Sequence, residues 1–182
     1  MIQVNPYEII HIAAHFGIAT TAVLERFVQP DKPWLKRGMD GACVFMDDAG
    51  CGIHPHRPLV CRVYPLGAQY DEQHAQYFFR MRLPDGSEGV FGEDGRVRDY
   101  LAAQGCPPYF DFARRSNGLR QRLLAHVEAG GVCRAPQGFG DDPMDWLDAD
   151  KVCALAGVDV AGLDEAGRFE RYEAVVASWL GD

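Results

Sequence analysis

A cysteine-rich stretch, residues 43–62, constrains the fold of this chain more than any other feature. It holds three thiols, two imidazoles and two guanidinium groups within twenty residues. Cys43 and Cys51 flank the turn-forming run Asp-Asp-Ala-Gly, so a tight hairpin would bring their sulfurs close together. Cys61 follows on a short predicted helix that has a proline on either side. A hairpin followed by a helix can point several thiols at one metal ion.

Length and charge predict one globular unit that does not bind nucleic acid. The 182 residues, 47% hydrophobic and 24% charged, are enough for one well-buried domain and few for two. The net charge of −8 argues against a nucleic-acid partner, because binding to phosphates needs a basic surface.

The absence of export signals and the use of cysteine together indicate a reducing compartment. No apolar run approaches the roughly 18 residues that a membrane-spanning helix needs, and the first residues lack the pattern of a secretory signal. We therefore expect a cytoplasmic protein with no membrane partner. Six cysteines in that compartment are more typical of metal or redox chemistry than of disulfides.

Two helices are predicted at the start of the chain. The run Asn-Pro-Tyr-Glu at 5–8 is a helix start with a capping box, and Gly17 closes that helix. Thr20 or Thr21 is expected to cap the second helix. Two helices joined by a glycine turn could form a helix-turn-helix DNA reader. The second helix carries only Arg26 as a cation, which favours a packed helical hairpin.

The rest of the chain predicts one strand pair and several helices. A strand is expected at 77–83 from its aromatic and alternating residues. Pro107 and Pro108 are expected to precede a long helix whose core positions include Leu124 and Val127. Helices are expected at 97–104, 109–128, 146–156 and 163–180, and turns around 70–72, 84–86 and 92–95.

These elements predict the fold class and the domain organisation. We expect a mainly α fold with a short β-hairpin or small sheet, in one metal-organised domain over residues 1–182. Residues 1–67 would supply the helical hairpin and the cysteine cluster. Residues 68–182 would supply the strand pair and the helices that pack on it.

The residue types of the cysteine stretch favour a site for a soft metal. Zinc takes about four thiolate or imidazole ligands, and Cys43, Cys51 and Cys61 with one histidine would supply a Cys3His set. His54 is preferred over His56 because it is nearer to Cys51 in sequence. The spacing, seven residues and then nine between cysteines, is not that of a zinc finger. An iron–sulfur cluster is the second option, and buried free cysteines beside a surface turn are the third.

Two arginines and three further cysteines complete the candidate chemistry. Arg57 and Arg62 would assist a metal site, because nearby cations lower the pKa of thiols and offset the charge of thiolates. Cys106, Cys133 and Cys153 are interpreted as structural, with Cys106 as the best reserve ligand.

The motif Cys-Gly-Ile-His-Pro-His-Arg-Pro-Leu-Val-Cys-Arg-Val-Tyr-Pro at 51–65, preceded by Cys-Val-Phe-Met-Asp at 43–47, resembles the signature of the YkgJ-type cysteine-cluster family. The resemblance extends to the helix start at 4–10 and more loosely through 97–127. That family is described as a zinc- or iron-chelating domain. The resemblance therefore implies metal binding by the three cysteines of the motif, Cys43, Cys51 and Cys61.

The sequence departs from the family pattern in two places. Members usually carry a Cys-x-x-Cys-Cys-like group just before the first helix, and this chain begins where that group should end. Many members also carry a cysteine after the strand that follows the cluster, where this chain has Pro-Asp-Gly-Ser at 84–87. A related cluster occurs in flagellin lysine methylases. No glycine-rich loop after a strand is present here to hold a nucleotide-like cofactor.

The predicted function is that of a metal-binding cysteine-cluster protein. It would hold zinc, iron or an iron–sulfur cluster through Cys43, Cys51, Cys61 and His54, either to handle the metal or to support a surface for a protein or peptide partner. The alternative is an iron–sulfur or iron-dependent oxidoreductase or modifying enzyme that acts on a peptide or protein. A DNA-binding regulator that uses residues 6–28 is the third hypothesis.

Overall fold

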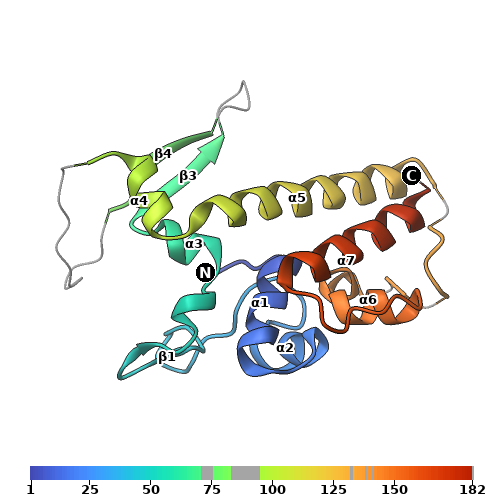
Figure 1. The fold of residues 1–182 in the computed structure, drawn as a ribbon, viewed down its shortest axis with the longest axis horizontal. Helices are drawn as coiled ribbons and strands as arrows, with labels where there is room; N and C mark the ends of the chain where they lie inside the picture. Colours follow the sequence, from blue (N-terminus) through green and yellow to red (C-terminus); the bar gives the residue numbers. More distant parts are fainter. Residues whose placement is uncertain (71–75, 83–94, 132, 138, 141, 182) are drawn as a thin grey trace.

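Helices make up most of the structure, a computed structural model in which all residues except 71–75, 83–94, 132, 138, 141 and 182 are described (Figure 1). Seven α-helices and two small antiparallel sheets occur among the described residues. The prediction of a mainly α chain with a short β-hairpin or small sheet is confirmed.

The elements follow one another in a simple order along the chain. They are α1 (Pro6–Phe16), α2 (Thr20–Phe27), β1 (Met46–Asp47), β2 (Gly50–Cys51), the 3-10 turn η1 (His54–His56), α3 (Leu59–Val63), β3 (Leu66–Tyr70), β4 (Gln76–Arg80), α4 (Val97–Ala103), α5 (Cys106–Glu128), the 3-10 turn η2 (Pro143–Leu147), α6 (Ala149–Leu155) and α7 (Glu165–Leu180).

Helix α1 begins and ends where the sequence predicts. The Asn5 side chain accepts a hydrogen bond from the Glu8 backbone N–H at 3.1 Å, and the Glu8 carboxylate accepts one from the Asn5 N–H at 2.9 Å. This reciprocal capping box satisfies two donors that a helix start otherwise leaves unpaired. Gly17 ends the helix with φ 62°, a left-handed conformation that glycine adopts without strain.

The core is built on both faces of α1, which lies between α2 and α7 and also contacts α5 (Figure 1). Tyr7 and Ile10 join the buried cluster of α5, α6 and α7, and the Tyr7 ring stacks on Phe112 with centroids 3.8 Å apart. Ile9 and Ile12 join a second cluster with α2 and the segment before the cysteine hairpin. Helix α1 therefore contributes to two apolar clusters, one shared with the C-terminal helices and one shared with α2.

Helix α7 has the predicted apolar face. All the residues expected in its core are buried, namely Phe169, Tyr172, Val175, Val176, Trp179 and Leu180. The Asp164 side chain caps its first turn by accepting a hydrogen bond from the Gly167 N–H at 2.8 Å.

Helix α5 ends at Glu128 as predicted, but it begins earlier than predicted and exposes two residues that were expected in the core. It begins at Cys106, so that Pro107 and Pro108 lie inside the first turn instead of before the helix. Proline is tolerated there because the first N–H groups of a helix have no intrahelical acceptor. Leu124 and Val127, predicted in the core, are 46% and 64% exposed. Leu124 lies five residues after the buried Leu119, one position beyond the helix face that Leu119 occupies. Val127 lies in the last turn of the helix.

The strand pair covers the start of α5. β3 pairs antiparallel with β4, so the strand predicted at 77–83 is found at 76–80. Phe78 packs on Phe110 of α5 with ring centroids 5.9 Å apart. Tyr77 and Phe79, on the other face of the strand, are 45% and 40% exposed. The predicted turn at 84–86, and most of those at 70–72 and 92–95, lie outside the described residues.

The predicted cap of α2 is wrong. The N-cap is Ala19, which makes no side-chain cap, and Thr20 is the first residue of the helix. Its hydroxyl donates to the Asp148 carboxylate at 2.6 Å, while its backbone N–H donates to Asp150 at 2.8 Å. Thr21 donates to the other oxygen of Asp148 at 2.6 Å. Side chains from before α6 and from within it thus replace the local cap.

Asp148 is expected to hold α2 against α6. Replacing Asp148 with alanine should lower the free energy of unfolding by about 2 kcal/mol, because two threonine hydroxyls lose a charged acceptor in a buried position. Urea denaturation measures this difference. Asp159→Ala, which removes one exposed side-chain-to-backbone bond, is the control and should cost well under half as much. Equal losses in the two variants would contradict the role given to Asp148.

No single helix among the described residues is long and apolar enough to cross a membrane. The pair α1 and α2 reaches that length and composition only when counted together, and it is bent by 95°.

Candidate metal centre

The cysteine stretch forms the predicted hairpin, although the strands are short. β1 and β2 pair antiparallel, with Met46 opposite Cys51. The Asp47 carboxylate accepts a hydrogen bond from the Ala49 N–H at 2.8 Å, which closes the turn between the strands. Cys43 lies before the hairpin and forms an isolated antiparallel bridge with Arg37.

The third cysteine is carried by α3, which is anchored to α1. Pro58 is the N-cap of α3, and Cys61 lies in the middle of this five-residue helix. The Leu59 N–H at its start donates to the Glu8 carboxylate at 2.7 Å. Glu8 therefore links the first turn of α1 to the first turn of the helix that carries Cys61.

These elements enclose one pocket of about 300 Å³ between the hairpin, η1 and α3. All three predicted thiols and the preferred histidine line it. The complete set of lining residues is Ile2, Cys43, Phe45, Met46, Cys51, His54, Arg57, Cys61, Tyr64 and Gln104. Each of the three cysteines is partly buried, so the thiols are accessible from the pocket but shielded from bulk water.

The three thiols are close enough to influence one another electrostatically. The pKa of Cys61 is raised to about 12, mainly by burial and in addition by the negative charges of Cys43 and Cys51. Arg57 acts in the opposite sense on the same thiol. A cation bound in this pocket would lower the pKa of the thiols, because it stabilises thiolates that otherwise repel one another.

His54 lines the pocket, but its Nδ1 already has a partner. Nη1 of Arg57 lies 3.1 Å from this nitrogen and also donates to the His54 carbonyl at 2.6 Å. A guanidinium only donates, so Nδ1 accepts and the neutral ring carries its proton on Nε2. His54 can bind a metal only after it gives up the contact with Arg57. Arg57 would then keep its bonds to the His54 carbonyl and to the Gln104 side chain.

The two arginines of the stretch have different surroundings. Arg57 lines the pocket, as expected for a cation that assists a thiolate site. Arg62 does not line it. Its guanidinium donates to the carbonyls of Pro55, Arg57 and Gln104 and to the Tyr109 hydroxyl, and it lies 4.1 Å from the centre of the Tyr109 ring.

The other cysteines lie away from the pocket wall. Cys106 is fully buried beside Val63 and Leu101, and burial raises its pKa. Cys153 is a core residue of α6, and Cys133 packs against the cluster of α5 and α7. None of the three lines the pocket, so Cys106 gains no support as a reserve ligand.

Sequence reasoning did not find Gln104. It follows α4 and reaches the pocket from the opposite side, where its side chain accepts a hydrogen bond from Arg57. A glutamine before a glycine at a helix end carries no local signal of such a contact.

A comparison with protein families gives the pocket its context. Residues 1–78 match the family model named CxxCxxCC, described as a "putative zinc- or iron-chelating domain". Residues 1–78 are called the CxxCxxCC segment below. In comparisons with curated proteins and with solved structures, no protein matched.

The CxxCxxCC segment of this chain contains three cysteines. The run Cys-x-x-Cys-x-x-Cys-Cys does not occur in the 182 residues, and Cys43, Cys51 and Cys61 are the thiols present between residues 1 and 78. All three line the same pocket. The donor set of this pocket, thiolates with an imidazole at its edge, is one that suits zinc and iron.

Proposed function

We propose that the CxxCxxCC segment binds zinc, iron or an iron–sulfur cluster through the thiolates of Cys43, Cys51 and Cys61. The observation that carries the proposal is that every thiol of the matched segment lines one pocket of about 300 Å³. Thiolates are the ligands that select these metals over calcium or magnesium.

His54 is proposed as the fourth ligand. It is the histidine that lines the pocket, and its contact with Arg57 is the one bond that must break. Arg57 would stay at the wall, where its charge offsets part of the negative charge of three thiolates. Gln104 would hold the guanidinium in that position.

The role proposed for this centre is to handle the metal or to support a surface that binds a protein or peptide. When bound, the metal would supply either a structural crosslink between hairpin and α3 or a redox centre. The chain's own residues would bind and shield it: Cys61 from α3, Cys51 from β2, Cys43 from the segment before the hairpin, and Phe45 from the apolar wall.

The second candidate function is an iron–sulfur or iron-dependent oxidoreductase or modifying enzyme that acts on a peptide or protein. The size of the pocket favours it, because about 300 Å³ exceeds the space of one ion and leaves room for a cluster or an external ligand. Tyr64, which is 41% exposed, lies on the wall of the pocket. An enzyme of this class would need an open metal position there.

Metal analysis and absorption spectroscopy on protein purified without oxygen test the proposal. We expect zinc without colour, or iron with sulfide and a broad visible absorption, in the natural protein. Replacing Cys43, Cys51 and Cys61 together with serine should remove that metal. It should also abolish the thiolate-to-cobalt absorption band of the Co²⁺-loaded protein.

Cys133→Ser is the matched control, because this cysteine lies outside the pocket. It should keep both the metal and the thiolate band. A triple variant that keeps the band, or natural protein that never shows one, would overturn the proposal. Iron with sulfide would direct the search toward enzyme activity, and zinc alone would direct it toward a binding partner.

A further inference from the structure

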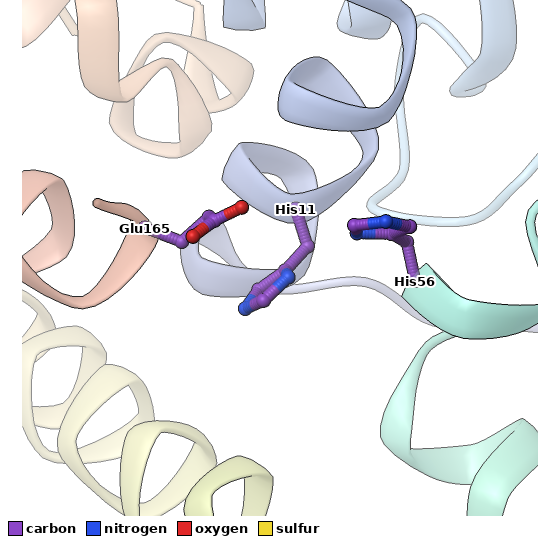
Figure 2. A group of neighbouring side chains, drawn as sticks. All are labelled: His11, His56 and Glu165. Atoms are coloured by element: carbon purple, nitrogen blue, oxygen red, sulfur yellow. The ribbon is translucent and has the colours of Figure 1, made fainter.

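Three side chains from distant parts of the chain converge beside α1, and none of them lines the cysteine pocket (Figure 2). His11 comes from α1, His56 from η1 and Glu165 from the first turn of α7. One nitrogen or oxygen of each lies within 4.8 Å of those of the other two. Figure 2 shows the His11 ring between the Glu165 carboxylate and the His56 ring.

His11 has polar atoms that the fold leaves unsatisfied. Both of its ring nitrogens are buried and have no hydrogen-bond partner. The ring lies against the rings of Tyr7 and Tyr109, with centroids 4.5 and 5.2 Å away. A buried polar atom without a partner costs about 1–3 kcal/mol, and native proteins contain few of them. We therefore expect the His11 imidazole to bind a partner in the working protein.

His56 shares this property and faces the same space. Its Nδ1 is also buried and without a hydrogen bond. The His56 ring lies 5.8 Å from that of His11 and 5.1 Å from that of His15, measured between centroids. Three imidazoles therefore gather at this point, two of them one turn apart on α1.

The His-Pro-His turn separates two sets of ligands. Because η1 is a 3-10 turn, His54 and His56 leave it in different directions. His54 lines the cysteine pocket, whereas His56 lies beside α1. One short turn thus supplies an imidazole to each of two places.

We propose that His11, His56 and Glu165 form a second metal site, which binds a divalent transition cation such as Zn²⁺ or Fe²⁺. Two imidazoles and one carboxylate are a donor set that suits these ions and leaves coordination positions open. Ligands about 2.1 Å from a tetrahedral ion lie about 3.4 Å apart, so side-chain rotations that bring the three atoms closer by up to about 1.4 Å complete the site.

The charges around the cluster are compatible with a bound cation. Glu165 supplies a negative charge, and burial lowers the pKa of His11 to about 4, which leaves this ring neutral at pH 7. Burial lowers the pKa of both His11 and His56, and the positive charge of Arg62 also acts on both in this direction. Its guanidinium is engaged by three carbonyls and the Tyr109 hydroxyl. Glu165 and His56 are half-exposed, so an ion can enter from solvent.

Metal titration of the variant with serine at positions 43, 51 and 61 tests this site independently of the cysteine pocket. Calorimetric titration with Zn²⁺ should show that this variant still binds one Zn²⁺ ion per chain. The Co²⁺ form should show visible bands without a thiolate-to-cobalt band. Adding His56→Gln and Glu165→Gln should weaken this binding at least tenfold. His126→Gln with Glu170→Gln, the same two changes outside the cluster, is the matched control and should leave it unchanged.

The result that overturns the second site is a serine variant that binds no Zn²⁺ above the level of its His56→Gln, Glu165→Gln derivative. An equal loss in the matched control would overturn it as well. If the serine variant does not fold, the same two changes are made in the natural protein. If these changes remove one equivalent of bound Zn²⁺ and leave the thiolate-to-cobalt band unchanged, the second site is supported. If the number of bound Zn²⁺ ions stays the same, the second site is overturned. The thiolate band reports on the cysteine pocket separately.

Discussion

Replacing Arg62 with methionine is expected to lower the free energy of unfolding by about 3–5 kcal/mol, the largest loss predicted for any single side chain here. Arg62 is 7% exposed and donates hydrogen bonds to three carbonyls, at 2.9 Å to Arg57 and Gln104 and at 2.5 Å to Pro55. It also donates to the Tyr109 hydroxyl at 2.9 Å. Methionine fills similar volume but leaves all four acceptors without this donor.

The effect follows from where these acceptors lie. They belong to η1, to Arg57 in the link between η1 and α3, to the end of α4 and to α5, so one guanidinium joins four segments around the candidate centre. Gly105, with φ 65°, allows the chain to turn closely past Arg62 between α4 and α5.

Urea denaturation of metal-free protein measures the loss. Arg62→Lys keeps the charge but not the planar set of donors, so its free energy of unfolding should lie between that of Arg62→Met and that of the natural protein. Arg114→Met, on the exposed side of α5, is the control and should change stability by less than about 0.5 kcal/mol. A methionine variant at position 62 as stable as this control would refute the role of Arg62.

Glu8 is expected to make the protein less stable as pH rises from 5 to 8. Its carboxylate is 3% exposed, and burial raises its pKa to about 7 against the effect of hydrogen bonds from Leu59 and Asn5. In the unfolded chain the group loses its proton near the ordinary value of 4.5. Between these two values the folded state binds more protons than the unfolded state, so stability is present at low pH and is lost as pH rises.

The expected size of this loss is about 2–3 kcal/mol, at 1.36 kcal/mol for each unit between pH 5 and the raised pKa of about 7. Glu8→Gln cannot titrate, so the difference in unfolding free energy between natural protein and variant should shrink by that amount from pH 5 to pH 8. The glutamine variant is less stable at pH 5, because its amide places a donor against a backbone N–H. Urea titrations with a chelator present give both curves.

Glu25→Gln changes an exposed carboxylate in the same way and serves as the control. The difference in unfolding free energy between Glu25→Gln and the natural protein should stay constant over this pH range. If the unfolding free energies of Glu8→Gln and the natural protein changed with pH in parallel, the buried carboxyl would be ionised throughout, and the prediction would be wrong.

Local signals predicted the first helix and the last one well. The capping box at Asn5 and Glu8 and the glycine after Phe16 act within a few residues, so they can be read without knowledge of the fold. The apolar spacing along α7 likewise gave its buried face. The start of α5 was predicted three residues late, because a Pro-Pro pair signals a helix break or a first turn equally well.

Contacts between distant residues were beyond sequence reasoning. The bond from Thr20 to Asp148 replaces a local cap, and a partner 128 residues away leaves no mark on the local pattern. The grouping of the three cysteines in one pocket followed from their short spacing. The second group did not, because Glu165 comes from a helix more than one hundred residues beyond His56. Only the i, i+4 spacing of His11 and His15 could have drawn attention to that face of α1.

The boundary of the family match is not a boundary of folding. Tyr7 and Ile10 belong to the matched residues 1–78, but α5, α6 and α7, which bury them, come later in the chain. A fragment that ended at residue 78 would present an aromatic and aliphatic stripe of α1 to water. The C-terminal helices thus act as a scaffold for the CxxCxxCC segment. What such a scaffold must keep is one apolar face of the right shape, so its sequence can vary widely while the centre it supports stays the same.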